Sequence, residues 1–222
     1  MAVMDFATAP GVSTRILDLE ALTRGEHFAE PYPHVLAMGC LSAAAAEAVR
    51  QSFPAVHKPG FHPAEEMERT GAYADLLEDL GSPAVARVLT ERLGLDLVGR
   101  PYMITVRRTS RPTDGRIHTD STSKIATILI YLNKTWDAGA GGCLRVLRGE
   151  HDFEDYVREV PPIEGTVFAF KRTDASWHGH KPFAGERLVI QLTFLESEEA
   201  VAHKKGLGKL QLGLKKLFVK DR

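Results

Sequence analysis

The sequence predicts an α+β protein with a mainly β core and with helices that precede it in the chain. Segments with helical spacing lie between residues 41 and 93, after a mixed stretch over 1–40. From Pro101 onward, β-branched residues alternate with period two, and turn residues recur about every ten positions. The 222 residues, 44% of them hydrophobic, are enough for one sizeable core. We therefore expect a single domain with three parts: a helical region over 1–100, a β core over 101–200 and a C-terminal tail over 201–222.

Three helices are expected before the β core. Ser42 is a suitable N-cap for the first helix, and Pro54 ends its alanine-rich run. Gly94 ends the third helix. The polar stretch 57–72, with its scattered prolines and glycines, is expected to be a loop that holds a short turn near 65–68. The expected helices span 41–53, 72–80 and 83–93.

Six strands are expected after Pro101. Segment 125–132 is almost entirely apolar, which predicts a strand buried on both faces. Short strands at such regular spacing indicate a barrel, a sandwich or a jelly roll. The expected strands span 102–108, 116–120, 125–132, 142–147, 166–171 and 188–195.

The tail differs from the rest in charge. Positions 201–222 hold seven basic residues and one acidic residue, Asp221, in a chain whose net charge is -1. Leucines at helical spacing predict a helix docked on its own domain or on a second copy, forming a homodimer. A membrane or partner surface is the alternative, which the glycines of the tail weaken.

Composition narrows the cellular context. The modest net charge gives no indication of nucleic acid as a partner. No apolar run is long enough to cross a membrane, and the N-terminus lacks the pattern of a secretory signal. The only two cysteines, Cys40 and Cys143, are far apart, which favours a reducing compartment. We therefore expect a cytoplasmic protein.

His118 and Asp120 are the first part of a candidate metal site. In a strand, residues i and i+2 project from the same face, so an imidazole and a carboxylate would lie side by side. His178, which follows a second apolar strand, supplies another imidazole. Two histidines and one carboxylate form the facial triad of non-haem iron, which leaves three positions open for a 2-oxo acid and oxygen. His180, two residues further on, is an alternative to His178 as the ligand.

Arg187 makes this pattern more specific. It lies nine residues after His178, beyond a turn that contains Pro182 and Gly185, and it begins the last expected strand. Its fixed guanidinium fork suits the distal carboxylate of a 2-oxo dicarboxylic acid. The combined spacing predicts an iron(II) and 2-oxoglutarate site. A zinc hydrolase with the same ligands is the alternative, but no general-base glutamate is evident beside them.

Residues 102–195 resemble the prolyl-4-hydroxylase-like branch of the 2-oxoglutarate and iron(II)-dependent oxygenases. The similarity is strongest in HTDSTSKIATILIYLNKTWDAGAGGCLRV and WHGHKPFAGERLVIQLTF. It implies a double-stranded β-helix, or jelly roll, flanked by N-terminal helices. It also implies that His118, Asp120 and His178 bind iron and that Arg187 and Tyr131 hold the C5 carboxylate of 2-oxoglutarate. Thr127, Leu129 and Val189 match positions that line the co-substrate pocket.

The resemblance implies a dioxygenase that hydroxylates a C–H bond and releases succinate and carbon dioxide, with ascorbate as a supporting reductant. The carboxylate of Asp120 favours hydroxylation over halogenation. The family's prolyl hydroxylases have a tyrosine on the strand before the HxD pattern, where this chain has Arg107 and Arg108. The substrate is therefore left open between a prolyl or other protein side chain and a small molecule, and the two arginines could receive an anionic one. A catalytically inactive metal-binding sensor or scaffold is a further alternative.

Overall fold

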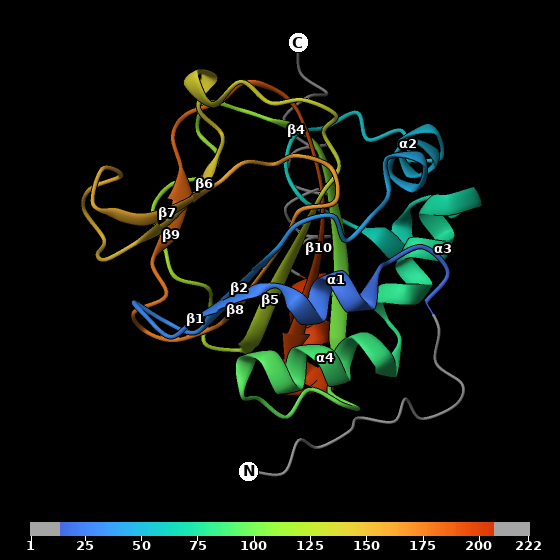
Figure 1. Ribbon diagram of the computed structural model, residues 1–222, viewed down its shortest axis with the longest axis horizontal. Helices are drawn as coiled ribbons and strands as arrows, with labels where there is room; N and C mark the ends of the chain where they lie inside the picture. The colour runs from blue at the N-terminus through green and yellow to red at the C-terminus, as the bar shows by residue number, and fades with distance from the viewer. Residues whose placement is uncertain (1–13, 207–222) are drawn as a thin grey trace.

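The computed structural model describes residues 14–206 and contains two antiparallel sheets (Figure 1). The major sheet has the strand order β1-β2-β8-β5-β10-β4-β3, and the minor sheet has the order β7-β6-β9. The strands of the major sheet are β1 (Glu26–Phe28), β2 (His34–Ala37), β3 (His62–Pro63), β4 (Tyr102–Ser110), β5 (Lys124–Tyr131), β8 (Val167–Lys171) and β10 (Gly185–Leu195). Those of the minor sheet are β6 (Leu144–Leu147), β7 (Tyr156–Val160) and β9 (His178–His180).

The chain passes repeatedly from one sheet to the other. After β4 and β5 it forms β6 and β7 of the minor sheet, returns as β8, crosses again as β9 and ends the core with β10. All pairings between the named strands are antiparallel. This alternation confirms the predicted mainly β core and its jelly-roll architecture.

Helices cover the face of the major sheet that is turned away from the minor sheet (Figure 1). Ser42 accepts a hydrogen bond from the amide of Ala45 at 3.1 Å, as expected of an N-cap. Gly94 adopts the left-handed conformation (φ 63°, ψ 40°) that ends the last helix before the β core. Four α-helices are named among the described residues: α1 (Leu19–Arg24), α2 (Ala43–Gln51), α3 (Gly71–Leu80) and α4 (Pro83–Leu93). Two 3₁₀ turns, η1 (Ala64–Glu66) and η2 (Ala138–Ala140), lie in loops.

Alternation along the strands gives the major sheet two different faces. Val106, Ile190 and Ile130 are paired across β4, β10 and β5 and belong to the core beneath the helices. Their neighbours Val189 and Tyr131 belong to a second buried cluster, which includes residues of β6 and β7. The helix-facing side of the sheet is therefore mostly structural, and its opposite side is free to form a cavity between the two sheets.

Several expectations from the sequence need correction. Segment 116–120 is not a strand: only His118 pairs there, through an isolated bridge to His178. Region 1–100 contributes β1, β2 and β3 in addition to helices, and β7 and β9 were also not anticipated. The chain is helical over 198–206, and the rest of the predicted tail helix lies outside the described residues.

Within residues 14–206, no helix has both the length and the apolar character needed to cross a membrane. Cys40 and Cys143 are both buried and not disulfide-bonded, in agreement with their separation in the sequence.

Candidate active site

Two segments that are distant in sequence bring the candidate histidines together. The backbones of His118 and His178 exchange two hydrogen bonds, each 3.0 Å long. Their rings lie 4.4 Å apart between centroids. Gly179 permits this approach, because a Cβ atom there would lie 2.7 Å from the carbonyl oxygen of Gly115. A single bridge between His118 and His178, and not the predicted strand 116–120, therefore positions the candidate ligands.

The three predicted ligands form one cluster. Each of His118, Asp120 and His178 offers a ligand atom, and these atoms all lie within 4.8 Å of one another. The Nδ1 atoms of His118 and His178 each lie 2.8 Å from a backbone carbonyl oxygen, that of Arg116 and that of Ser176. Because these contacts require Nδ1 to carry the proton, both Nε2 atoms keep a free lone pair for a metal. The set fits an ion held by two imidazoles and one carboxylate.

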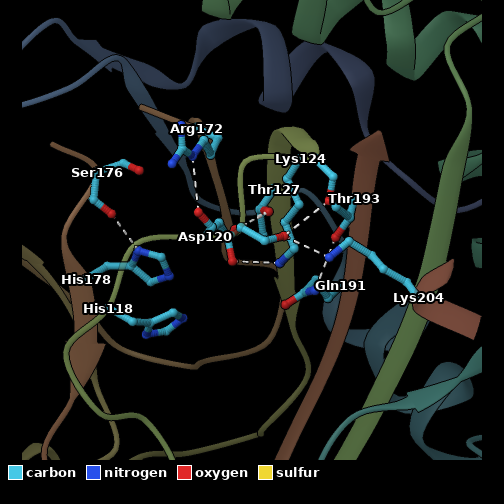
Figure 2. Close-up of polar contacts among 12 residues, drawn as sticks. His118, Asp120, Lys124, Thr127, Arg172, Ser176, His178, Gln191, Thr193 and Lys204 are labelled. Carbon is cyan, nitrogen blue, oxygen red and sulfur yellow. Dashed lines mark hydrogen bonds and ion pairs between the residues drawn. The ribbon is translucent and has the colours of Figure 1, made fainter. Parts of the chain in front are cut away.

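Asp120 is held by three other side chains (Figure 2). Lys124 Nζ lies 2.6 Å from one carboxylate oxygen, and the hydroxyl of Thr127 donates to the other oxygen at 2.6 Å. The Nε of Arg172 donates to the backbone carbonyl of Asp120 at 3.1 Å. These contacts fix the direction of the carboxylate without help from a metal.

The surroundings of the cluster set its protonation. Burial and, after it, the neighbouring His118 together lower the pKa of His178 to about 4, so the imidazole is neutral near pH 7. Burial alone would raise the pKa of Asp120, but the charge of Lys124 and the hydrogen bonds from Lys124 and Thr127 outweigh it and lower the pKa to about 2. The pair therefore presents a neutral nitrogen and a charged oxygen, as metal binding requires.

A cavity of about 230 Å³ connects this cluster with Arg187. Arg187 is buried; its Nε donates to the carbonyl of Gly142 at 2.9 Å, and its Nη2 lies 3.5 Å from the hydroxyl of Tyr131. A larger hollow of about 530 Å³ lies between α3, η1 and β4, but its wall contains no histidine. The wall of the smaller cavity includes the three clustered residues together with Arg107, Lys124, Thr127, Leu129, Arg187 and Gln191.

The remaining predicted pocket residues take different positions. Thr127 and Leu129 line the cavity. Tyr131 is fully buried, and its ring lies under the guanidinium of Arg187, with 5.2 Å from the ring centroid to Cζ. Val189 is also fully buried and lies beside Tyr131 in the register of β5 and β10, but it is not part of the cavity wall.

His180, the alternative ligand, is not part of the cluster that brings His178 to His118 and Asp120. Its ring lies against Gly115, where a Cβ atom would approach it to 2.3 Å, and it faces the Arg187 end of the same cavity. Burial, followed by the charge of Arg187, lowers the pKa of His180 to about 4, so its ring is neutral.

The sequence did not single out every residue of the site. Lys124, Arg172, Gln191 and Phe61 were not proposed, because an isolated charged, polar or aromatic residue carries no spacing signal. Lys124 is four residues beyond Asp120, and only the short loop between them places its ammonium on the carboxylate.

Comparison with known proteins agrees with this geometry. Residues 105–194 match the family model described as the 2OG-Fe(II) oxygenase superfamily. No curated protein matches the chain by sequence.

Solved structures share the fold at low sequence identity. A prolyl 4-hydroxylase from Phytophthora capsici has a TM-score of 0.54 and 19% identity over 90% of this chain and 78% of that one. A Pseudomonas putida prolyl-4-hydroxylase has a TM-score of 0.52 and 16% identity over 81% and 97%. HygX from Streptomyces hygroscopicus, solved with nickel and 2-oxoglutarate bound, has a TM-score of 0.53 and 12% identity over 74% and 82%.

Proposed function

We propose that this chain, a member of the 2OG-Fe(II) oxygenase superfamily, hydroxylates a C–H bond at a site where His118, Asp120 and His178 bind Fe(II). The observation that carries the proposal is the cavity itself. It places three ligand atoms within 4.8 Å of one another and has a buried arginine elsewhere on its wall. A 2-oxo dicarboxylic acid has one chelating end and one anionic end, and these match the two groups.

When bound, Fe(II) and 2-oxoglutarate supply the oxidising chemistry: one oxygen atom of O₂ enters the product alcohol and the other enters succinate as carbon dioxide is lost. The protein's own residues orient and shield the reactants. Arg187 and Tyr131 bind the distal carboxylate through the guanidinium and the phenol. Thr127 and Lys124 hold Asp120 in the direction in which it meets the metal.

The substrate class is inferred from the structurally similar proteins and from the residues of the cavity wall. Two of the structurally similar proteins are named prolyl 4-hydroxylases, which supports a peptidyl or amino-acid substrate with a saturated ring. Arg107 occupies the cavity wall where the prolyl hydroxylases are expected to have a tyrosine, so we keep a small-molecule substrate as the alternative. Localisation in the cytoplasm and dimerisation through the basic tail remain predictions from the sequence.

The experiment measures 2-oxoglutarate turnover with and without added substrates. The Fe(II)-loaded protein should form succinate slowly from 2-oxoglutarate and oxygen even without a substrate, and faster with the correct one. Asp120→Ala should lower Fe(II) affinity at least about a hundredfold, since it removes a charged ligand. Asp155→Ala is the matched control, because Asp155 is a 53% exposed carboxylate that pairs with Arg148 on the surface.

Two alternative functions give different results in the same assay. A metal-binding sensor would bind Fe(II) and 2-oxoglutarate but form no succinate with any substrate. A zinc hydrolase would retain zinc on purification and show no dependence on 2-oxoglutarate. Either result would overturn the proposed reaction.

A further inference from the structure

Arg107 is a second arginine on the wall of the cavity, largely but not fully buried, and the proposed reaction assigns it no role. It lies on β4 opposite Val189 of β10, which in turn pairs with Tyr131 of β5. The guanidinium carbon lies 4.2 Å from the ring centroid of Phe61, which also lines the cavity. Only 11% of the side chain is exposed. Such stacking holds the guanidinium in one plane and leaves its edge available for an acceptor.

The protein supplies this guanidinium with little compensating charge. Its nearest carboxylate among the described residues, that of Asp114, lies 4.0 Å away and is also bound by Arg111. The hydroxyl of Ser110 lies at 3.5 Å, and Nε has no hydrogen-bond partner within residues 14–206. Burial and the like charge of Arg187 together lower the pKa of Arg107 to about 10, yet the group is still charged at neutral pH.

Arg187 is equally short of negative charge. Its contacts among the described residues are neutral: the carbonyl of Gly142 and the hydroxyl and ring of Tyr131. Two buried guanidiniums that face the same cavity repel each other, and both lack a full ionic partner. Buried charges of this kind are costly unless a ligand of opposite charge pairs with them.

The charged and polar groups near Arg107 indicate which end of the cavity it serves. The groups close enough to shift the pKa of Arg107 are Arg187, Asp114, Tyr131 and Arg111. The groups that shift the pKa of Asp120 are instead Lys124, His178 and Thr127. Arg107 therefore belongs to the Arg187 end of the cavity and not to the metal end.

We propose that Arg107 is a second guanidinium on the distal carboxylate of 2-oxoglutarate, so that this carboxylate is held between Arg107 and Arg187. This inference rests on the proposed function, since it assumes that 2-oxoglutarate binds in this cavity. A carboxylate has two oxygens and about four lone pairs, enough to accept from both arginines and from the phenol of Tyr131. Phe61 acts as the platform that aims Arg107 at it.

The test compares binding of two 2-oxo acids to the Fe(II)-loaded protein without oxygen, measured by calorimetry. The acids are 2-oxoglutarate and 2-oxopentanoate, which has the same five carbons but a methyl group in place of the distal carboxylate. Arg107→Met should weaken 2-oxoglutarate binding roughly tenfold or more, the value of a charge-assisted hydrogen bond. It should leave Fe(II) affinity and 2-oxopentanoate binding unchanged within about twofold. Arg107→Lys should restore part of the loss because it keeps the charge.

Arg108→Met is the matched control. Arg108 is the next residue on β4, points away from the cavity, is 37% exposed and pairs with Glu186 at 3.1 Å. The Arg108→Met variant should bind both acids with the affinities of the unmodified protein. Arg187→Met should weaken 2-oxoglutarate binding at least as much as Arg107→Met does.

Three outcomes would overturn the inference. If Arg107→Met binds 2-oxoglutarate normally, Arg107 serves another ligand, such as an anionic substrate. If it weakens both acids and Fe(II) alike, its role is structural. If the unmodified protein does not bind 2-oxoglutarate at all, the proposed function fails together with the inference, which separates that case from the first two.

Discussion

At the scale of single residues, the chemistry of the ligands decides what a sequence can reveal. A metal or a carboxylate accepts few residue types, so His118, Asp120, His178 and Arg187 could be chosen as candidates from residue type and spacing alone. The structure brings the first three together and places Arg187 on the same cavity. The groups that orient them could not be found in this way, because a lysine such as Lys124 is usually a solvated surface charge.

Protonation of two buried histidines predicts how the stability of the metal-free protein depends on pH. His178 and His180 both have a pKa lowered to about 4 in the folded state, mainly by burial, against an ordinary value of 6.5. The unfolded chain therefore takes up protons below about pH 6.5, while the folded chain does so only near pH 4. Stability should be full above pH 6.5 and fall as the pH drops toward 4, by up to about 3 kcal/mol for each histidine.

Urea unfolding of the metal-free protein at pH 7.5 and at pH 5 measures this loss. His180→Gln removes one of these groups and should reduce the loss by the share of one histidine, while His178 and His34, whose pKa burial also lowers, still contribute. His151→Gln is the control, since that ring is 88% exposed. Equal loss in His180→Gln and the unmodified protein would show that His180 does not titrate as described.

At the scale of elements, local patterns identified all the long helices and strands but missed several of the short ones. Helices α2, α3 and α4 and strands β4, β5, β8 and β10 were predicted with shifts of only a few residues. The missed β3 and β9 have two and three residues, too few for a periodic pattern. The wrong prediction was the strand at 116–120, where a single bridge to His178 positions the candidate ligands. Such a bridge depends on a partner about sixty residues away, which no local pattern can show.

A substitution at Gly179 tests how far metal binding depends on the bridge between His118 and His178. A Cβ atom there would lie 2.7 Å and 3.0 Å from the carbonyl oxygens of Gly115 and Arg116. These are backbone atoms, which cannot move away without a cost in stability. Gly179→Ala should therefore push the segment before His118 away from β9 and lower Fe(II) affinity at least about tenfold. The cost in stability should be about 1–3 kcal/mol, as for other overpacked sites.

Metal titration of the purified variant tests this expectation. Gly149→Ala is the matched control, because an added Cβ there meets nothing within 4 Å. An unchanged Fe(II) affinity in Gly179→Ala would mean that the bridge is not what holds His118 beside His178.

At the scale of the whole molecule, the major sheet separates the apolar core that stabilises the fold from the cavity that holds the candidate site. Its helix-facing side carries the larger apolar core, and its other side carries Tyr131, Leu129 and the cavity. The sequence predicted helices and a β core but not that β1 and β2 complete the major sheet. β2 pairs with β8, more than 120 residues later, and only the assembled fold shows this pairing. The division of labour between the faces follows from strand alternation once the register is known.

This division predicts that stability and ligand binding can be changed separately. Leu89 of α4 is fully buried in the helix-side core, so Leu89→Ala should cost about 2–5 kcal/mol of unfolding free energy. Because the sheet lies between it and the cavity, Fe(II) and 2-oxoglutarate affinities measured well below the melting temperature should stay within about twofold. Leu129→Ala is the matched change on the other face, since Leu129 is buried and lines the cavity. It should lower both stability and 2-oxoglutarate affinity. If Leu89→Ala weakened ligand binding as much as Leu129→Ala, the two faces would be coupled and the sheet would not act as a rigid support for the site.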